Sequence, residues 1–157
     1  MSTTSIFDPQ SFLDATTTEA ATKRPPIPAG TELVGVISKI ASRAWQGKKD
    51  PTQGGIVIDA TVEFDLDAAP PHIKQLVGLP KVTIQDGIML DLTDAGSIDY
   101  APGKNSKLRR YREALGLNTP GQSFAPRMME GRTVRCKIKN EPYEGDIFDK
   151  IESVAKV

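Results

Sequence analysis

The residues of this chain that are capable of acid–base or metal chemistry are few and scattered. His72 is the only histidine and Cys136 the only cysteine among 157 residues. A single thiol excludes an internal disulfide, and one residue of each kind excludes a Cys/His metal cage. A Ser-His-Asp arrangement could draw only on His72, which follows two prolines in a predicted loop. We therefore interpret His72 as a surface residue.

Carboxylates gather at one place, in the segment 56–66. Asp59, Glu63 and Asp65 alternate there with apolar residues, so they share one face of a predicted strand. Such a set could hold a divalent cation, but outward carboxylates on a strand usually serve solubility. The glycine-containing loop GKKDPTQGG lacks the spacing of a phosphate-binding P-loop. The sequence therefore predicts no enzyme and no cofactor.

Basic residues are the most concentrated chemistry of the chain. Residues 101–140 contain ten lysines and arginines against two glutamates, although the whole chain has no net charge. Such segregation creates a field that attracts polyanions, unless folding interleaves the two signs. The stretch 104–117, KNSKLRRYREALGL, is the densest part. We interpret four of its residues as a secondary basic surface: Lys107, Arg109, Arg110 and Arg112.

Two clusters combine aromatic and basic residues. Single-stranded nucleic acids are held by basic grooves with aromatic side chains on which bases stack. One cluster lies in a predicted loop after residue 44, and the other is a basic strand that leads into a turn. Taken singly, each aromatic residue could instead pack in the core or brace its turn. Together they predict nucleic-acid contacts by Trp45, Lys48, Lys49, Arg135, Lys137, Lys139 and Tyr143.

Five segments show the two-residue alternation typical of β-strands. The clearest is 56–66, whose apolar residues alternate with the acidic outer face described above. The third segment is expected to be broken or bulged at Asp86-Gly87, because glycine often marks a bulge. The predicted strands cover residues 31–45, 56–66, 81–92, 131–140 and 147–157.

One helix is predicted, at about residues 107–115. Leu108, Tyr111 and Leu115 fall on one stripe at helical spacing. Ser106 is the predicted cap of its first turn. Arg109 and Arg110 are expected to point outward, with Arg112 at the edge of the stripe. In an OB-fold such a helix closes one end of a β-barrel, away from the usual binding cleft, so the helix arginines are expected to give general attraction rather than close contacts.

The order of elements is three strands, one helix and two strands. This is the order of an OB-fold, so the sequence predicts a mainly β protein: a five-stranded OB-fold-like antiparallel barrel with one helix between strands 3 and 4. An open α+β sheet is the rival architecture. Residues 1–29 are predicted to form an extended arm or linker, because they are rich in Thr, Ala and Pro. Residues 30–157 are the predicted OB-fold-like domain.

The arm carries two of the five phenylalanines, Phe7 and Phe12. These predict docking on a homo-oligomeric copy or on another protein, which would be a phage protein if the resemblance described below holds, although a loosely attached terminus is the other possibility. No apolar run reaches the length of about 18 residues that a membrane helix needs, so no membrane partner is expected. The start of the chain lacks the pattern of a signal peptide. We therefore expect a cytoplasmic protein.

Three segments of the chain resemble phage-encoded OB-fold single-stranded-DNA-binding proteins. They are the entry RPPIPAGTELVGVI, the short helix LRRYREALGL and the closing hairpin GRTVRCKIKNEPYEGDIFDKIESV. The resemblance covers residues 25–157 and implies non-catalytic single-stranded DNA binding in phage replication or recombination, in the host cell cytoplasm. The chain departs from many such proteins because it ends in SVAKV, without an acidic, aromatic-tipped tail. Recruitment of partners would then fall to the arm.

A second hypothesis comes from a different functional class. A small β-rich body with a long arm bearing hydrophobic anchors would also suit a phage virion or assembly accessory protein that docks through this arm. The two hypotheses differ in what they require. Single-strand binding requires the basic and aromatic residues to line an open surface, whereas the accessory function requires Phe7 and Phe12 to pack on another chain.

Overall fold

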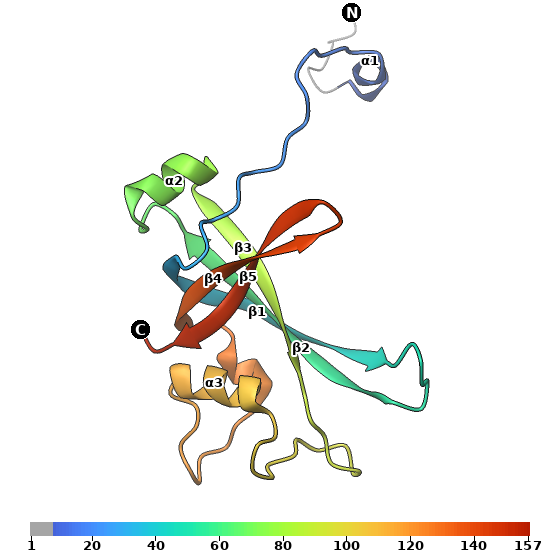
Figure 1. Ribbon diagram of the computed structural model, residues 1–157, viewed down its shortest axis with the longest axis vertical. Coiled ribbons are helices and arrows are strands. Elements are labelled where there is room, and N and C mark those ends of the chain that lie inside the picture. The colour runs from blue at the N-terminus through green and yellow to red at the C-terminus, as the bar shows by residue number, and fades with distance from the viewer. Residues whose placement is uncertain (1–7) are drawn as a thin grey trace, which may run out of the picture.

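The structure is a computed structural model that describes residues 8–157, which form one five-stranded antiparallel sheet with short helices around it (Figure 1). A long twisted β1–β2 hairpin and a shorter β4–β5 hairpin extend from the body. The elements in chain order are α1 (Pro9–Leu13), β1 (Glu32–Gln46), β2 (Gly54–Asp65), α2 (Pro71–Val77), β3 (Lys81–Met89), α3 (Ser106–Ala114), the 3-10 turn η1 (Pro126–Met129), β4 (Thr133–Tyr143) and β5 (Asp146–Ala155).

The strands are ordered β3-β2-β1-β4-β5, and every neighbouring pair is antiparallel. The sheet is open, because no ladder joins the edge strands β3 and β5 in the described part of the chain. Its twist nevertheless brings these two edges near each other. The predicted mainly β class, the five antiparallel strands and the helix between the third and fourth strands are confirmed.

Helix α3 packs across the gap between the edges of the sheet. Leu108, Tyr111 and Leu115 are all buried, as the helical stripe predicts. The Tyr111 hydroxyl donates to Oδ2 of Asp86 on β3 at 2.5 Å, and Lys107 Nζ lies 2.7 Å from the other oxygen of the same carboxylate. These bonds fix the rotation of α3 about its axis, and therefore fix which of its cations face which neighbour.

The predicted break in β3 at Asp86-Gly87 is wrong. The register with β2 runs without a shift along the whole strand, and bulges lie instead at Ser38 of β1 and Glu152 of β5. Gly87 forms part of the regular ladder, and a Cβ there would make only an ordinary contact with the Asp59 carboxylate, at 3.5 Å. Because the strand is unbroken, Asp86 keeps its place on the inner, buried face.

The helical content also differs from the prediction in detail. Besides α3, the chain forms the short helices α1 and α2, and Ser106 does not cap α3. Asn105 occupies the cap position with a left-handed φ of 54° and no side-chain cap bond. Its side chain is used elsewhere: Nδ2 donates to the carbonyls of Asp91 and Asp99, each at 2.9 Å.

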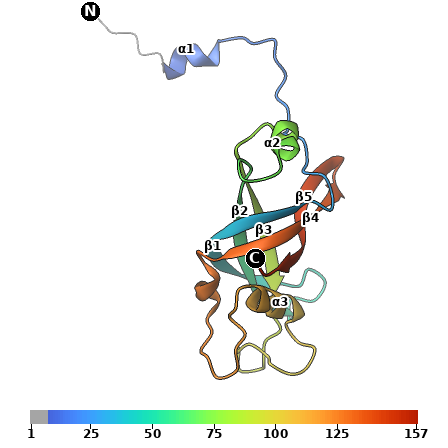
Figure 2. The ribbon, with the colours of Figure 1, turned by 90° about the vertical axis from the view of Figure 1, so that its left-hand side faces the viewer.

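The arm has two parts. Figure 2 shows α1 standing apart from the sheet at the end of an extended segment. The later part is anchored, because Arg24 Nη1 lies 2.6 Å from Asp149 Oδ2 and Lys23 Nζ lies 2.6 Å from Asp146 Oδ2. Ile27 is fully buried in the core although it lies within the predicted arm. The predicted contact residue Phe7 lies outside the described residues.

None of the described helices is long and apolar enough to cross a membrane.

Candidate nucleic-acid interface

The outward side of β4 carries a row of cations, as the alternation predicts. Arg135, Lys137 and Lys139 alternate with the buried residues Val134, Cys136 and Ile138. Arg135 lies between Val34 of β1 and Ala155 of β5, and it forms no ion pair within residues 8–157. Lys137 and Lys139 lie 3.7 and 4.0 Å from single exposed glutamates, which are weak pairs. The row therefore keeps most of its positive charge.

A further cation stands directly across from this row. Lys139 is paired in register with Lys150 of β5, so both side chains project from the same face of the sheet. Like charges directly opposite each other in an antiparallel pair destabilise the sheet. No carboxylate in the described chain lies within ion-pair distance of Lys150. The two lysines thus hold a position that suits an anion from outside the chain.

The β4–β5 hairpin exposes two aromatic rings. Glu144 and Gly145 have φ values of 50° and 80°, which is the backbone of a tight two-residue hairpin turn. This turn sets Tyr143 and Phe148 edge to face, with ring centroids 6.3 Å apart, and leaves them 65% and 40% exposed. They line a cavity of about 420 Å³ together with Glu141, Pro142 and Lys150.

The secondary basic surface divides into two sides. Lys107 and Arg110 line a cavity of about 180 Å³ that also includes Lys139 of β4. Arg109 and Arg112 instead line a separate cavity beside the segment 98–105. The helical period separates the pairs, because residues three apart share a side of a helix. The structure therefore joins half of the helix cations to the β4 row.

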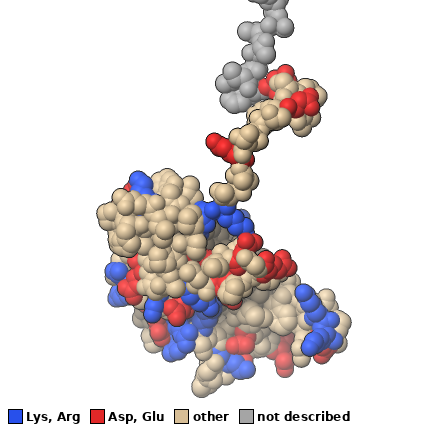
Figure 3. All heavy atoms as spheres, turned by 45° about the horizontal axis from the view of Figure 1, so that its top comes forward, with Lys and Arg blue, Asp and Glu red and all other residues tan. Residues whose placement is uncertain are grey.

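The β1–β2 hairpin holds the other predicted cluster. Lys48 and Lys49 are exposed in its loop, and Figure 3 shows basic atoms at the end of this hairpin, at the lower right. The Trp45 indole is folded across the strands, so close that a Cβ on Gly55 would lie 2.7 Å from Trp45 Nε1. This nitrogen is buried and has no hydrogen-bond partner among residues 8–157. The Nε1 edge of the indole therefore packs against the backbone at Gly55 and braces the hairpin.

The two predicted clusters do not form one small cleft. Strand β1 pairs with β4 only through Glu32–Val36, whereas Trp45 lies at the opposite end of β1, about 30 Å of strand away. Both hairpins project from the same side of the body in Figures 1 and 2. A nucleic acid that touched both would have to follow the sheet between them.

Sequence reasoning missed Phe148 and Lys150. Both lie on β5, and their partners across the ladder are Glu141 and Lys139. The signal was present in the alternation of IFDKIESVAKV. The alternation alone does not show which β4 residues lie beside Phe148 and Lys150. That depends on the hairpin register, which places each β5 residue opposite a particular β4 residue.

The acidic face of β2 is largely neutralised within the sheet. Arg43 Nε donates to Asp59 Oδ2 at 2.8 Å, and Lys81 Nζ lies 2.8 Å from Glu63 Oε1. Asp59 is buried beneath its partner. No group of three His, Cys, Asp or Glu residues in the described chain could hold a metal ion. The acidic strand therefore does not form an open field that would repel a polyanion.

These contacts describe a surface for binding. Fixed cations supply attraction to phosphates, and exposed rings supply apolar platforms. Comparison with protein-family models finds no match for this chain, and comparison with curated proteins finds none either.

Proposed function

We propose that this chain is a non-catalytic single-stranded-DNA-binding protein that holds the strand along the outer face of β4 and β5. The observation that carries the proposal is the placement of Lys139 directly opposite Lys150, with only a weak 4.0 Å contact from Lys139 to the exposed Glu141. Folding alone does not favour this repulsive pair. A phosphate between the two ammonium groups would convert the repulsion into two charge-assisted contacts.

The aromatic cavity supports a single strand over a duplex. Its two charged residues, Glu141 and Lys150, offset each other. A base can stack on Tyr143 or Phe148 only if it is unpaired and splayed from its neighbours. We expect phosphates to follow the row from Arg135 to Lys139 and a base to enter the cavity at its end.

The fold proposed for this function is an OB-fold. The observed strand order is that of a five-stranded barrel opened between β3 and β5. In the proposed barrel, α3 fills the opening through its bonds to Asp86 on one edge and its packing against β5 on the other. In such folds the first and last hairpin loops flank the binding surface.

A role in phage replication or recombination, within the host cytoplasm, is proposed from the resemblance of three segments noted above. The alternative is a phage virion or assembly accessory protein. One observation supports it: Phe12 and Leu13 are 76% and 80% exposed on α1. Deletion of residues 1–22 distinguishes these two functions, because it should abolish docking on a shell protein and leave single-strand binding unchanged.

The direct test is a fluorescence-anisotropy titration of a labelled oligothymidylate at low and high salt. We expect saturable binding that weakens steeply as salt rises, because phosphate contacts release counterions. A duplex of the same length should bind more weakly. Absence of binding to the single strand at the lowest salt concentration would overturn the proposal.

A further inference from the structure

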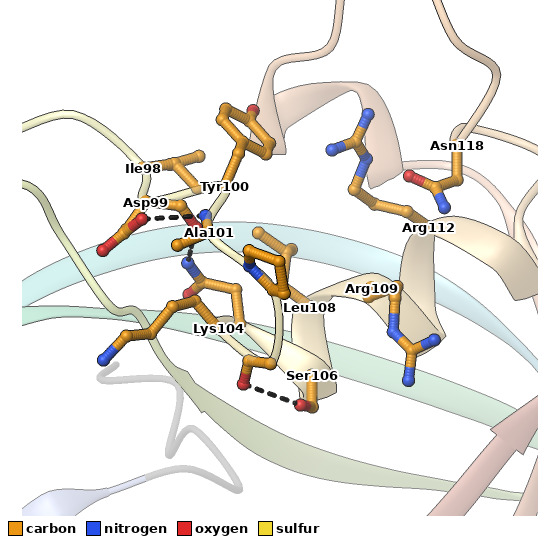
Figure 4. Close-up of a pocket in the computed structure, with 13 residues that line it drawn as sticks. Ile98, Asp99, Tyr100, Ala101, Lys104, Ser106, Leu108, Arg109, Arg112 and Asn118 are labelled. Atoms are coloured by element: carbon orange, nitrogen blue, oxygen red, sulfur yellow. Dashed lines mark hydrogen bonds between the residues drawn. The ribbon is translucent and has the colours of Figure 1, made fainter.

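The cavity behind α3 is distinct from the β4–β5 face. It has a volume of about 370 Å³ and is enclosed by the segment 98–105, by one side of α3 and by Asn118 (Figure 4). Cavities of about 300–1,000 Å³ are typical of small-molecule sites. The size is therefore sufficient for a single nucleotide.

Arg112 is fixed in the wall of this cavity. Its Nε donates to the carbonyl of Leu117 at 3.0 Å, and its guanidinium lies over the Phe124 ring, 4.1 Å from the centroid. Neither contact uses the two terminal nitrogens, and Arg112 forms no ion pair with any of residues 8–157. A guanidinium that is already immobilised loses little entropy on binding, and its free fork matches a phosphate.

The charge around Arg112 is positive. Arg109 lies three residues earlier on the same side of the helix, and within the described part of the chain its one ion pair, with Glu113, is exposed and 3.6 Å long. Asp99 is the one acidic residue in the lining, and its Oδ1 accepts the backbone N–H of Ala101 at 2.9 Å. Figure 4 shows Lys104 extending away from the two arginines. The arginines are thus the cations available to an anion here.

The opposite wall is rigid and ends in an exposed ring. Asn105 is buried and held to Asp91 by bonds in both directions, including the Asp91 backbone N–H donating to its Oδ1 at 2.7 Å. Its side chain also holds the carbonyl of Asp99, the residue before Tyr100. Tyr100 is 70% exposed at the edge of the cavity. An exposed tyrosine on a fixed support is a platform for a planar base.

We propose that this cavity binds a nucleotide, with its phosphate on Arg112 and its base on Tyr100; the guanidinium of Arg109 points away from that of Arg112 (Figure 4) and adds only general attraction. The shared chemistry is a nucleotide bearing a terminal phosphate. Its source is either a free mononucleotide or the 5′-phosphorylated end of a strand. This site does not depend on the proposed function of the β4–β5 face.

The test is an NMR titration of the ¹⁵N-labelled full chain with deoxyadenosine 5′-monophosphate, with deoxyadenosine and with inorganic phosphate. We expect the nucleotide to bind more tightly than either fragment and to shift the amides of residues 98–118. No shift in this segment with the nucleotide, or shifts confined to β4 and β5, would overturn the proposal, whatever the chain does with long strands.

Three variants locate the contacts. Arg112→Gln should weaken nucleotide binding about 10- to 100-fold, as the loss of a charge-assisted contact does. Tyr100→Ala should weaken nucleotide binding and leave inorganic phosphate binding unchanged. Arg110→Gln is the matched control, because it removes the same charge from the other side of α3 and should leave nucleotide binding unchanged. Equal loss in Arg110→Gln and Arg112→Gln would show general attraction and contradict the site.

Two further measurements complete the test. Because Arg112 stacks on Phe124, thermal melting checks that Arg112→Gln is folded, and the exposed Tyr100→Ala keeps the test independent of that result. Unchanged nucleotide binding in a folded Arg112→Gln or in Tyr100→Ala would overturn the proposal. Oligonucleotides with and without a 5′-phosphate then identify the source. A preference for the phosphorylated strand that Arg112→Gln abolishes indicates a strand end, and equal binding of both strands indicates a free nucleotide.

Discussion

At the end of the β1–β2 hairpin an aromatic ring lies against the backbone, whereas at the end of the β4–β5 hairpin two rings are exposed. Both hairpins combine aromatic residues with lysines. The difference arises from the residue across the ladder. Trp45 is opposite Gly55, which leaves space for the indole to fold over. Tyr143 and Phe148 lie opposite Asp146 and Glu141 rather than a glycine, and their rings contact each other edge to face.

The lysines of the two hairpins differ as well. Lys48 and Lys49 lie in a loop, where each side chain can move away from the other. Lys139 and Lys150 are held opposite each other by a regular ladder. Cations fixed by a ladder are preorganised for a phosphate, and cations in a loop lose entropy when they bind. The same residue types therefore predict different contributions to binding, which paired variants can measure.

The largest effect is expected from removing the fixed lysines. Lys139→Gln combined with Lys150→Gln should weaken single-strand binding by about 10- to 100-fold at low salt and reduce the salt slope by at most about 1.4, since each lost contact with a single strand accounts for about 0.7. Lys48→Gln combined with Lys49→Gln is the matched control and should have a smaller effect. Anisotropy titrations over a salt series measure both. A larger loss in the control would place the interface on β1–β2.

The aromatic residues give the second comparison. Tyr143→Ala should cost about 1–3 kcal/mol of binding free energy with an unchanged salt slope, because stacking releases no counterions. Trp45→Ala should mainly lower the melting temperature, because its indole braces the hairpin. Thermal melts and binding isotherms of both variants separate the two roles. Loss of binding in a stable Trp45→Ala variant would instead support base stacking at the first hairpin.

Residues on the inner faces of β4 and β1 are expected to contribute differently to the pH dependence of stability above pH 9. Burial, helped by the charge of Asp86, raises the pKa of the Cys136 thiol on β4 to about 12. The unfolded chain ionises this thiol above its ordinary value of 9.0, so its stabilising contribution is full below pH 9 and is lost as the pH rises towards 12. The loss should be about 1.4 kcal/mol per pH unit in this range. Leu33, which lies opposite Cys136 on β1, has no ionisable group and adds nothing to this pH dependence.

Tyr111 adds to the same loss. Burial, with the nearby Asp86 carboxylate, raises the pKa of its phenol, so the folded chain keeps it neutral while the unfolded chain ionises it above pH 10.0. Urea unfolding of the wild type and of Cys136→Ala at pH 8 and above measures the combined loss and the share that Cys136 contributes to it. The variant should be less stable at pH 8 but lose less stability with rising pH. An identical slope in the variant would contradict the contribution of Cys136.

The arm is expected to stabilise the β4–β5 hairpin and not the β1–β2 hairpin. Arg24→Ala leaves the carboxylate of Asp149, whose side chain is only 2% exposed, without its ion pair. We expect a loss of about 1–3 kcal/mol, because a buried charge is left unpaired. Deletion of residues 1–22, which keeps Lys23 and Arg24, should leave the melting temperature unchanged. A large loss in that deletion would show that α1 contributes to the folded body.

The smallest effect concerns the repulsion itself. Lys150→Glu places opposite charges across the ladder and should stabilise the hairpin by about 0.2–1 kcal/mol while it weakens strand binding. Lys48→Glu, in the loop of the other hairpin, should change stability less. Chemical denaturation and anisotropy on the same preparations compare the two. Unchanged or lower stability in Lys150→Glu would show that the lysine pair carries no repulsive cost.

The sequence alone determined the strands, the helix near 107–115 and the outward row on β4, because each follows from a local period of two or of 3.6 residues. It could not determine which segments lie opposite each other. The register of β5 placed Lys150 across from Lys139, and the unbroken course of β3 turned Asp86 inward, where it fixes the rotation of α3. That rotation sent Arg112 to one cavity and Arg110 to another. Such choices depend on non-local packing and on the residue across each ladder, so only the tertiary structure decided them.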